Sequence, residues 1–75
     1  MNQEPMRERI INLRLDNNLT PQEVADALEM SVRQYKRLEK GEKKITTKLI
    51  IKLSLYYDVS SDYLICLSND KERKK

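Results

Sequence analysis

Residues 20–41 read TPQEVADALEMSVRQYKRLEKG, and they predict two short helices joined by a tight turn. The first helix follows Thr20, whose side-chain oxygen can accept a hydrogen bond from a free amide at the helix start. Pro21 suits the first helical position because no amide donor is needed there. Glu23 stands three residues after Thr20 and completes a capping box. These signals predict that a helix begins at Pro21.

The second helix of this stretch follows Ser31, which repeats the N-cap signal. Tyr35 and Leu38 give it a narrow apolar stripe, and Gly41 offers the left-handed residue that ends it. Between Leu28 and Ser31 only two residues remain. A link this short forces a sharp bend between two packed helices, which is the geometry of a helix-turn-helix.

A helix before this pair is predicted to begin at Pro5 and to end at Asn18, which can adopt the left-handed conformation in place of glycine. Its apolar residues recur at helical spacing, at Met6, Ile10 and Leu13. Residues 1–4 are expected to form a frayed end.

Two more helices are predicted after the pair. The segment TKLIIKLSLYYD follows an N-cap at Thr46 or Thr47, and SDYLICL follows an N-cap at Ser60. The longer helix carries apolar residues on two faces, whereas a surface helix needs only one. The surplus face consists of Ile51, Leu55 and Tyr56. This surplus indicates either deep burial or contact with a helix of another subunit.

The length of 75 residues limits the chain to one domain. We expect this domain over residues 1–67, followed by a charged and disordered tail at residues 68–75. The single glycine and two prolines favour an all-α fold. No apolar run approaches about 18 residues and no signal-peptide pattern is present, so a cytoplasmic protein is expected.

The residue types present argue against an enzyme or a metal protein. The sequence has no histidine, so it offers no Ser/His or Cys/His nucleophilic pair. Its one cysteine, Cys66, lies in an apolar run and excludes both an intramolecular disulfide and a transition-metal cage. Tyr35, Tyr57 and Tyr63 are interpreted as packing residues whose hydroxyl groups reach water. The sequence therefore predicts no catalytic residue, no metal and no cofactor.

Charge is distributed unevenly along the chain, whose net charge is +3. Residues 15–30 contain four acidic residues and no basic one, whereas residues 31–48 contain seven basic residues and two acidic ones. Positive charge concentrated on one helix and its following loop indicates contact with a polyanion. A solvated surface is the alternative, and charge alone does not decide between the two.

The pattern L-T-P-Q-E-V-A-D-x-L-x-M-S-x-x-x-Y-x-x-L-E-x-G at residues 19–41, with DVSSDYL at residues 58–64, resembles the phage-repressor-like (Xre-type, Cro/CI-like) helix-turn-helix family. The resemblance covers about residues 6–67. It implies a five-helix, lambda-repressor-like fold with the helix-turn-helix at helices 2 and 3. It also implies that Ala25 lets these two helices approach, and that Arg14 and Glu39 form an ion pair that fixes the angle of the reading helix.

The sequence departs from the family pattern at three positions. Glu29 replaces the turn glycine, so it must accept an unusual backbone conformation or shift the turn by one residue. Pro21 replaces a glutamine that approaches a phosphate, so this contact falls to Gln22 or to the hydroxyl of Thr20. Val32 is apolar where many relatives are polar, and it either contacts a thymine methyl group or packs against the protein.

On this interpretation the chain is a sequence-specific double-stranded DNA-binding regulator, expected to be a repressor, that reads the major groove with its third helix. The residues expected to contact base edges are Val32, Arg33, Lys36 and Arg37. The residues expected to contact the phosphate backbone are Thr20, Gln22, Ser31, Gln34, Lys40, Lys43 and Lys44.

A homodimer is expected, because a two-fold dimer reads two half-sites and so gains selectivity that one small domain lacks. The candidate contact residues are Ile51, Leu55, Tyr56, Ile65 and Leu67. Burial in the core is the alternative explanation for each of them. A second interpretation is an antitoxin or protein-interaction module that binds another protein through the apolar fourth helix.

Overall fold

A computed structural model describes residues 3–65, which form five α-helices and contain no strand. The helices are α1 (Glu4–Asp16), α2 (Pro21–Ala27), α3 (Val32–Lys40), α4 (Thr47–Tyr57) and α5 (Ser61–Leu64). The prediction of an all-α fold with five helices is therefore confirmed. No helix in this part of the chain combines the length and the apolar character needed to cross a membrane.

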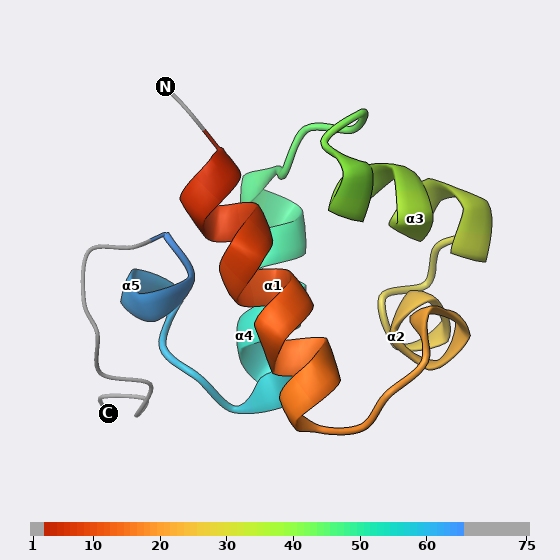
Figure 1. Ribbon diagram of the computed structural model, residues 1–75. Helices are drawn as coiled ribbons and strands as arrows, with labels where there is room; N and C mark the ends of the chain where they lie inside the picture. The colour runs from red at the N-terminus through yellow and green to blue at the C-terminus, as the bar shows by residue number, and fades with distance from the viewer. Residues whose placement is uncertain (1–2, 66–75) are drawn as a thin grey trace.

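Helix α1 crosses the middle of the molecule (Figure 1). Helices α2 and α3 lie on one side of it and α5 on the other, while α4 lies behind it in this view. Helix α3 contacts both α2 and α1, whereas α5 contacts α1 and α4. The pair α2–α3 is the predicted helix-turn-helix, and α1 is the support on which α3 rests.

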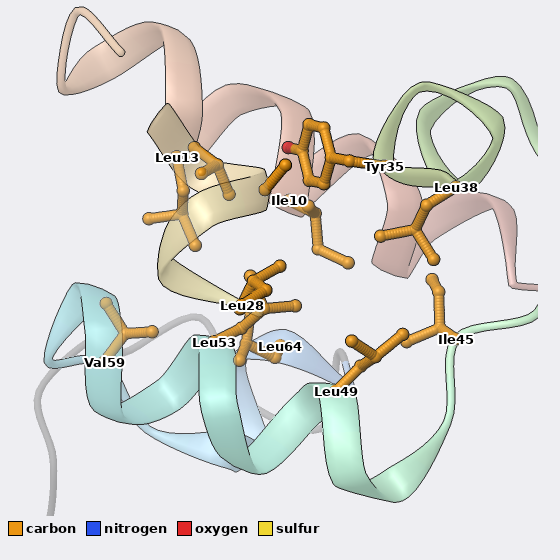
Figure 2. Packing of buried hydrophobic residues seen from close by; sticks show 12 residues of the cluster. Ile10, Leu13, Leu28, Tyr35, Leu38, Ile45, Leu49, Leu53, Val59 and Leu64 are labelled. Carbon is orange, nitrogen blue, oxygen red and sulfur yellow. The ribbon is translucent and has the colours of Figure 1, made fainter. Parts of the chain in front are cut away.

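All five helices contribute to one apolar core (Figure 2). Tyr35 and Leu38 reach into it from α3, and both side chains are 0% exposed. Ala25 of α2 is also fully buried, which agrees with its predicted role as the small residue between α2 and α3. The buried apolar residues are Ile10, Leu13, Val24, Ala25, Leu28, Tyr35, Leu38, Ile45, Leu49, Leu53, Val59 and Leu64.

Four helices begin at the predicted N-cap side chains. The side-chain oxygens of Thr20, Ser31, Thr46 and Ser60 each accept a hydrogen bond from the amide three residues later, at 3.0–3.2 Å. At Thr20 the capping box is complete, because its own amide donates to Glu23 at 3.1 Å. Thr46, and not Thr47, caps α4. These caps define the starts of α2, α3, α4 and α5 from local sequence alone.

The first four helices end at residues with positive φ: Asn18 (55°), Glu29 (58°), Gly41 (85°) and Asp58 (54°). After each of them the next amide bonds back to a carbonyl five residues earlier, as in a Schellman motif. Asn18 and Gly41 were predicted for this role. Asp58 was predicted only as part of a short turn.

Glu29 adopts the left-handed conformation and the turn is not shifted. The amide of Met30 donates to the carbonyl of Ala25 at 3.0 Å, which closes the end of α2. Lys52 of α4 donates to the carbonyl of Leu28 at 3.2 Å, and its ammonium group lies 3.6 Å from the Glu29 carboxylate. Thus contacts from α4 hold this turn although it lacks the family's glycine.

Three expectations at the ends of the chain need correction or lie outside the structure. Residues 3 and 4 are not frayed, because Gln3 is hydrogen-bonded to Ile45 and Glu4 is the first residue of α1. Helix α5 ends at Leu64, earlier than the predicted segment SDYLICL. Cys66, Leu67 and the proposed tail at residues 68–75 lie outside the described residues.

Candidate nucleic-acid interface

The candidate interface is the outer face of α3. Tyr35 and Leu38 face the core, and the residues on the other side of the helix face outward. Arg33, Lys36 and Arg37 are all exposed. Within residues 3–65 none of these three side chains forms a hydrogen bond or an ion pair with another residue. Their charges are therefore available to a ligand.

A shallow groove runs along this face and has a volume of about 370 Å³. Its walls are formed by Val32, Arg33, Lys36, Arg37, Lys40 and Glu42. All four residues predicted to contact bases thus line one surface. Val32 packs partly against the core and also lines the groove, so its packing is confirmed and its contact with a thymine methyl group stays a prediction. Glu42 is the single acidic residue of the lining and places a negative charge at one end.

The residues predicted to contact phosphates fall into two groups. Lys40 lines the groove at the end of α3, and Lys43 and Lys44 lie in the next loop, where Lys43 is half-buried. Thr20 and Ser31 stand at the starts of α2 and α3, where each oxygen accepts a backbone amide. Because the hydrogen atom of each hydroxyl is not used by that bond, both groups retain a donor.

The two glutamines of this set differ in their surroundings. The side-chain amide of Gln22 donates to the Asp26 carboxylate at 2.8 Å, so it is already engaged on the surface of α2. Gln34 is exposed on α3, and its backbone amide donates to Ser31. A phosphate contact by Gln22 would have to compete with its bond to Asp26, whereas the side chain of Gln34 has no such competitor among the described residues.

An ion pair joins α3 to α1. Arg14 of α1 donates to Glu39 of α3 through two nitrogens, at 2.7 and 3.2 Å, and also to the carbonyl of Leu19 at 3.1 Å. The two side chains are only 14% and 15% exposed. The hydrogen bond to Glu39 raises the pKa of Arg14 above its ordinary value. A two-point bond of this kind defines direction as well as distance.

Two tyrosine hydroxyl groups are buried near this ion pair. Neither the Tyr35 nor the Tyr57 hydroxyl has a hydrogen-bond partner of normal geometry in the described part of the chain. Burial raises the pKa of Tyr35 well above its ordinary value, and its interaction with Glu39 adds to this. Burial also raises the pKa of Tyr57 to about 12. The expectation that these hydroxyls reach water was wrong for both residues.

Three supporting residues were missed from the sequence. Arg9 of α1 donates to the carbonyl of Tyr63 at 2.9 Å and its guanidinium lies 4.3 Å from the centre of the Tyr63 ring. Gln3 and Arg7, also of the N-terminal segment, contact the loop after α3. Each of the three contacts a residue far away in the sequence, so no local sequence pattern predicts these contacts.

The residues described contain no cluster of three or more histidine, cysteine or carboxylate side chains that could hold a metal ion. Comparisons with curated proteins and with solved structures found no match. The helix-turn-helix family model HTH_3 matches residues 10–64, which span α1 from its middle to the end of α5. This range includes the groove, the ion pair and both turn residues of the helix-turn-helix. The chain therefore belongs to the HTH_3 (Xre-like) helix-turn-helix family, whose members bind DNA and regulate transcription.

Proposed function

We propose that the chain is a sequence-specific double-stranded DNA-binding repressor that reads the major groove with α3 as a homodimer. The observation that carries this proposal is the contrast across α3. Its inner face is fully buried by Tyr35 and Leu38, whereas the cations of its outer face are exposed and have no partner among residues 3–65. An α-helix that is packed firmly against its domain and carries cations on its exposed face can bind in the major groove of DNA.

Sequence discrimination is assigned to the groove residues. Arg33 and Arg37 can each donate two hydrogen bonds to the O6 and N7 atoms of a guanine, which present a pattern unique to that base pair. Lys36 donates to a base or to a phosphate. Val32 stands at the start of α3 and offers a methyl surface to a thymine. These residues define a short cognate half-site.

Affinity that is independent of sequence is assigned to residues around the groove. Lys40, Lys43 and Lys44 neutralise phosphates on one side, and release of counterions from the DNA drives this contact. Donors at the helix starts contact the backbone on the other side, where the positive end of each helix dipole adds to the attraction. These donors are the side chains of Thr20, Gln22, Ser31 and Gln34.

Dimerisation is assigned to the apolar face of α4. Ile51, Leu55 and Tyr56 are 53%, 61% and 40% exposed, so ordinary core burial does not account for them. Ile65 is half-buried at the end of α5 and extends the candidate face. A two-fold dimer then places two copies of α3 at half-sites about one helical turn of DNA apart, and occupancy of such a site blocks transcription.

Selection of binding sites from random duplex DNA tests the proposal. A palindromic consensus is expected, with guanines at the positions that Arg33 and Arg37 contact. Recovery of no consensus would contradict sequence-specific reading. A consensus with a single, unpaired half-site would contradict the dimer and leave base reading intact.

The exposed apolar face of α4 also favours a second candidate function, that of an antitoxin or protein-interaction module. In that case a different protein, not a second copy, covers Ile51, Leu55 and Tyr56. Purification of the tagged chain from its native host, followed by mass measurement of the intact complex, separates the two. A homodimer supports the first function, and a stable heteromer supports the second. For either role the expected location is the cytoplasm.

A further inference from the structure

The loop between α3 and α4 carries Lys43 and Lys44, two of the proposed phosphate contacts. Loops that carry ligand-binding side chains are usually the least ordered part of a small domain. An unordered lysine pays an entropic cost each time it binds a phosphate. Contacts that order this loop in the free protein would therefore favour binding of a phosphate.

One end of the loop is held by Gln3. This residue occupies the N-cap position of α1, yet its side chain makes no capping bond. Instead, its Nε2 donates to the carbonyl of Ile45 at 3.0 Å, and its Oε1 accepts from the amide of Ile45 at 2.9 Å. One amide side chain thus satisfies both backbone groups of a residue 42 positions away. The Ile45 side chain is 6% exposed, so Ile45 is held by its backbone and by the core at once.

The other end of the loop lies against Arg7, which is one helical turn after Gln3 on the same face of α1. The Arg7 side chain is 18% exposed, forms an ion pair with Glu4 and covers Gly41. A Cβ atom at Gly41 would lie 2.8 Å from the guanidinium carbon of Arg7. The positive φ of 85° at Gly41 favours glycine at this position.

We propose that Gln3 and Arg7 are positioning residues for DNA binding. They clamp the two ends of the loop onto α1 and so hold Lys43 and Lys44 ready for a phosphate before DNA arrives. Neither residue needs to touch DNA. This inference rests on the proposed function, because it assigns the loop's purpose to phosphate contact.

The test uses Gln3→Met, which keeps the length of the side chain and removes both hydrogen bonds to Ile45. Asn12→Met is the matched control, since Asn12 is an exposed residue of the same helix. Binding to the selected duplex and to a random duplex is measured over a range of salt concentrations. Gln3→Met should weaken binding to both duplexes by about 3- to 10-fold, the range that corresponds to the cost of ordering one long side chain on binding. It should also reduce the salt slope by up to about one unit. Asn12→Met should change neither quantity.

A double-mutant cycle separates positioning from general destabilisation. In a chain that carries Lys43→Ala and Lys44→Ala, Gln3→Met should cause no further loss of DNA affinity, because the groups that it positions are gone. An equal loss in both backgrounds would overturn the proposal, since Gln3 would then act through folding or by direct contact. No loss in the wild-type background would overturn it as well.

Hydrogen exchange of the free protein keeps this test distinct from a test of DNA binding. Gln3→Met should speed exchange of the Ile45 amide, which is bonded to Gln3, and leave exchange in α2 unchanged. If the wild-type chain binds no duplex, the proposed function and the assigned purpose of the clamp both fail, while faster exchange at Ile45 still shows that Gln3 anchors the loop. Unchanged exchange at Ile45 rejects the clamp whatever the chain binds.

Discussion

On the inner face of α3, Tyr35 and Leu38 are 0% exposed, and Glu39 is bound through two hydrogen bonds to Arg14. On the outer face, Arg33 and Arg37 are exposed and have no partner among the described residues. Both faces belong to one helix of nine residues. Packing in the core restricts which side chains can occupy the inner face. The outer face requires only residues that are compatible with a helix.

This difference separates stability from binding within one element. A cation without an intramolecular partner adds little to folding, because water solvates it equally well in the unfolded chain. Such a cation on a rigid helix is free to bind an anionic ligand, which the proposed function identifies as DNA. Substitutions on the inner face should unfold the domain, and those on the outer face should affect only what it binds.

The largest effect is expected from Leu38→Ala on the inner face. Removal of a fully buried leucine side chain leaves a cavity, which should lower the free energy of unfolding by about 2–5 kcal/mol. Chemical denaturation measures this change. Arg37→Ala, one position away on the outer face, should alter the free energy of unfolding by no more than about 0.5 kcal/mol. Similar losses for the two variants would show that the faces are not separate.

On the outer face, Arg37→Ala should remove about 1–3 kcal/mol of binding free energy for the selected site and relax discrimination at one base pair. Competition between cognate and random duplexes measures this effect. Lys48→Ala, which removes one charge from the exposed start of α4, is the control and should leave discrimination unchanged. If Arg37→Ala weakens binding to cognate and random DNA equally, Arg37 contacts a phosphate and not a base.

The buried hydroxyls of Tyr35 on α3 and Tyr57 on α4 predict instability in alkali. The pKa of Tyr57 is raised to about 12 in the folded state, and that of Tyr35 is also raised, so the folded protein retains protons that the unfolded chain loses above about pH 10. Stability should therefore be intact below pH 10 and should fall as the pH rises above it, by at most about 1.4 kcal/mol per pH unit for each tyrosine. Thermal unfolding of Tyr57→Phe between pH 8 and 12 should show a smaller fall than wild type. An equal fall in stability for Tyr57→Phe and wild type would show that the Tyr57 hydroxyl is exposed to water.

The smallest effect is expected at the turn before α3. Glu29 holds φ at 58°, a conformation that costs a side-chain residue free energy but costs glycine little. Glu29→Gly should raise the free energy of unfolding by about 0.5–1 kcal/mol, because the pair that it loses with Lys52 is a surface contact of 3.6 Å. DNA affinity should stay the same, since the turn already has the required geometry. A loss of affinity would show that Glu29 or Lys52 also sets the angle of α3.

The sequence predicted those features that local chemistry determines. The caps at Thr20 and Ser31 and the left-handed Asn18 depend on residues within a few positions, so their patterns can be recognised in the chain. The Arg14–Glu39 pair spans 25 positions and was expected only because the chain resembled a family.

Features that depend on tertiary contacts could not be predicted in this way. Gln3 reaches Ile45 across 42 positions, and the burial of the Tyr35 and Tyr57 hydroxyls depends on how α1, α3 and α4 pack together. A glutamine or a tyrosine has the same local signature whether its polar group meets water or protein. The candidate reading residues were identifiable because they are defined by opposition to Tyr35 and Leu38 on one helix.

The proposed function depends on contact between the outer face of α3 and DNA. A titration of the isotope-labelled chain with its selected duplex, followed by nuclear magnetic resonance, tests it most directly. The largest chemical-shift changes should occur at Arg33, Lys36 and Arg37, with smaller ones at Lys43 and Lys44. Shifts confined to Ile51, Leu55 and Tyr56, with the α3 signals unchanged, would contradict it.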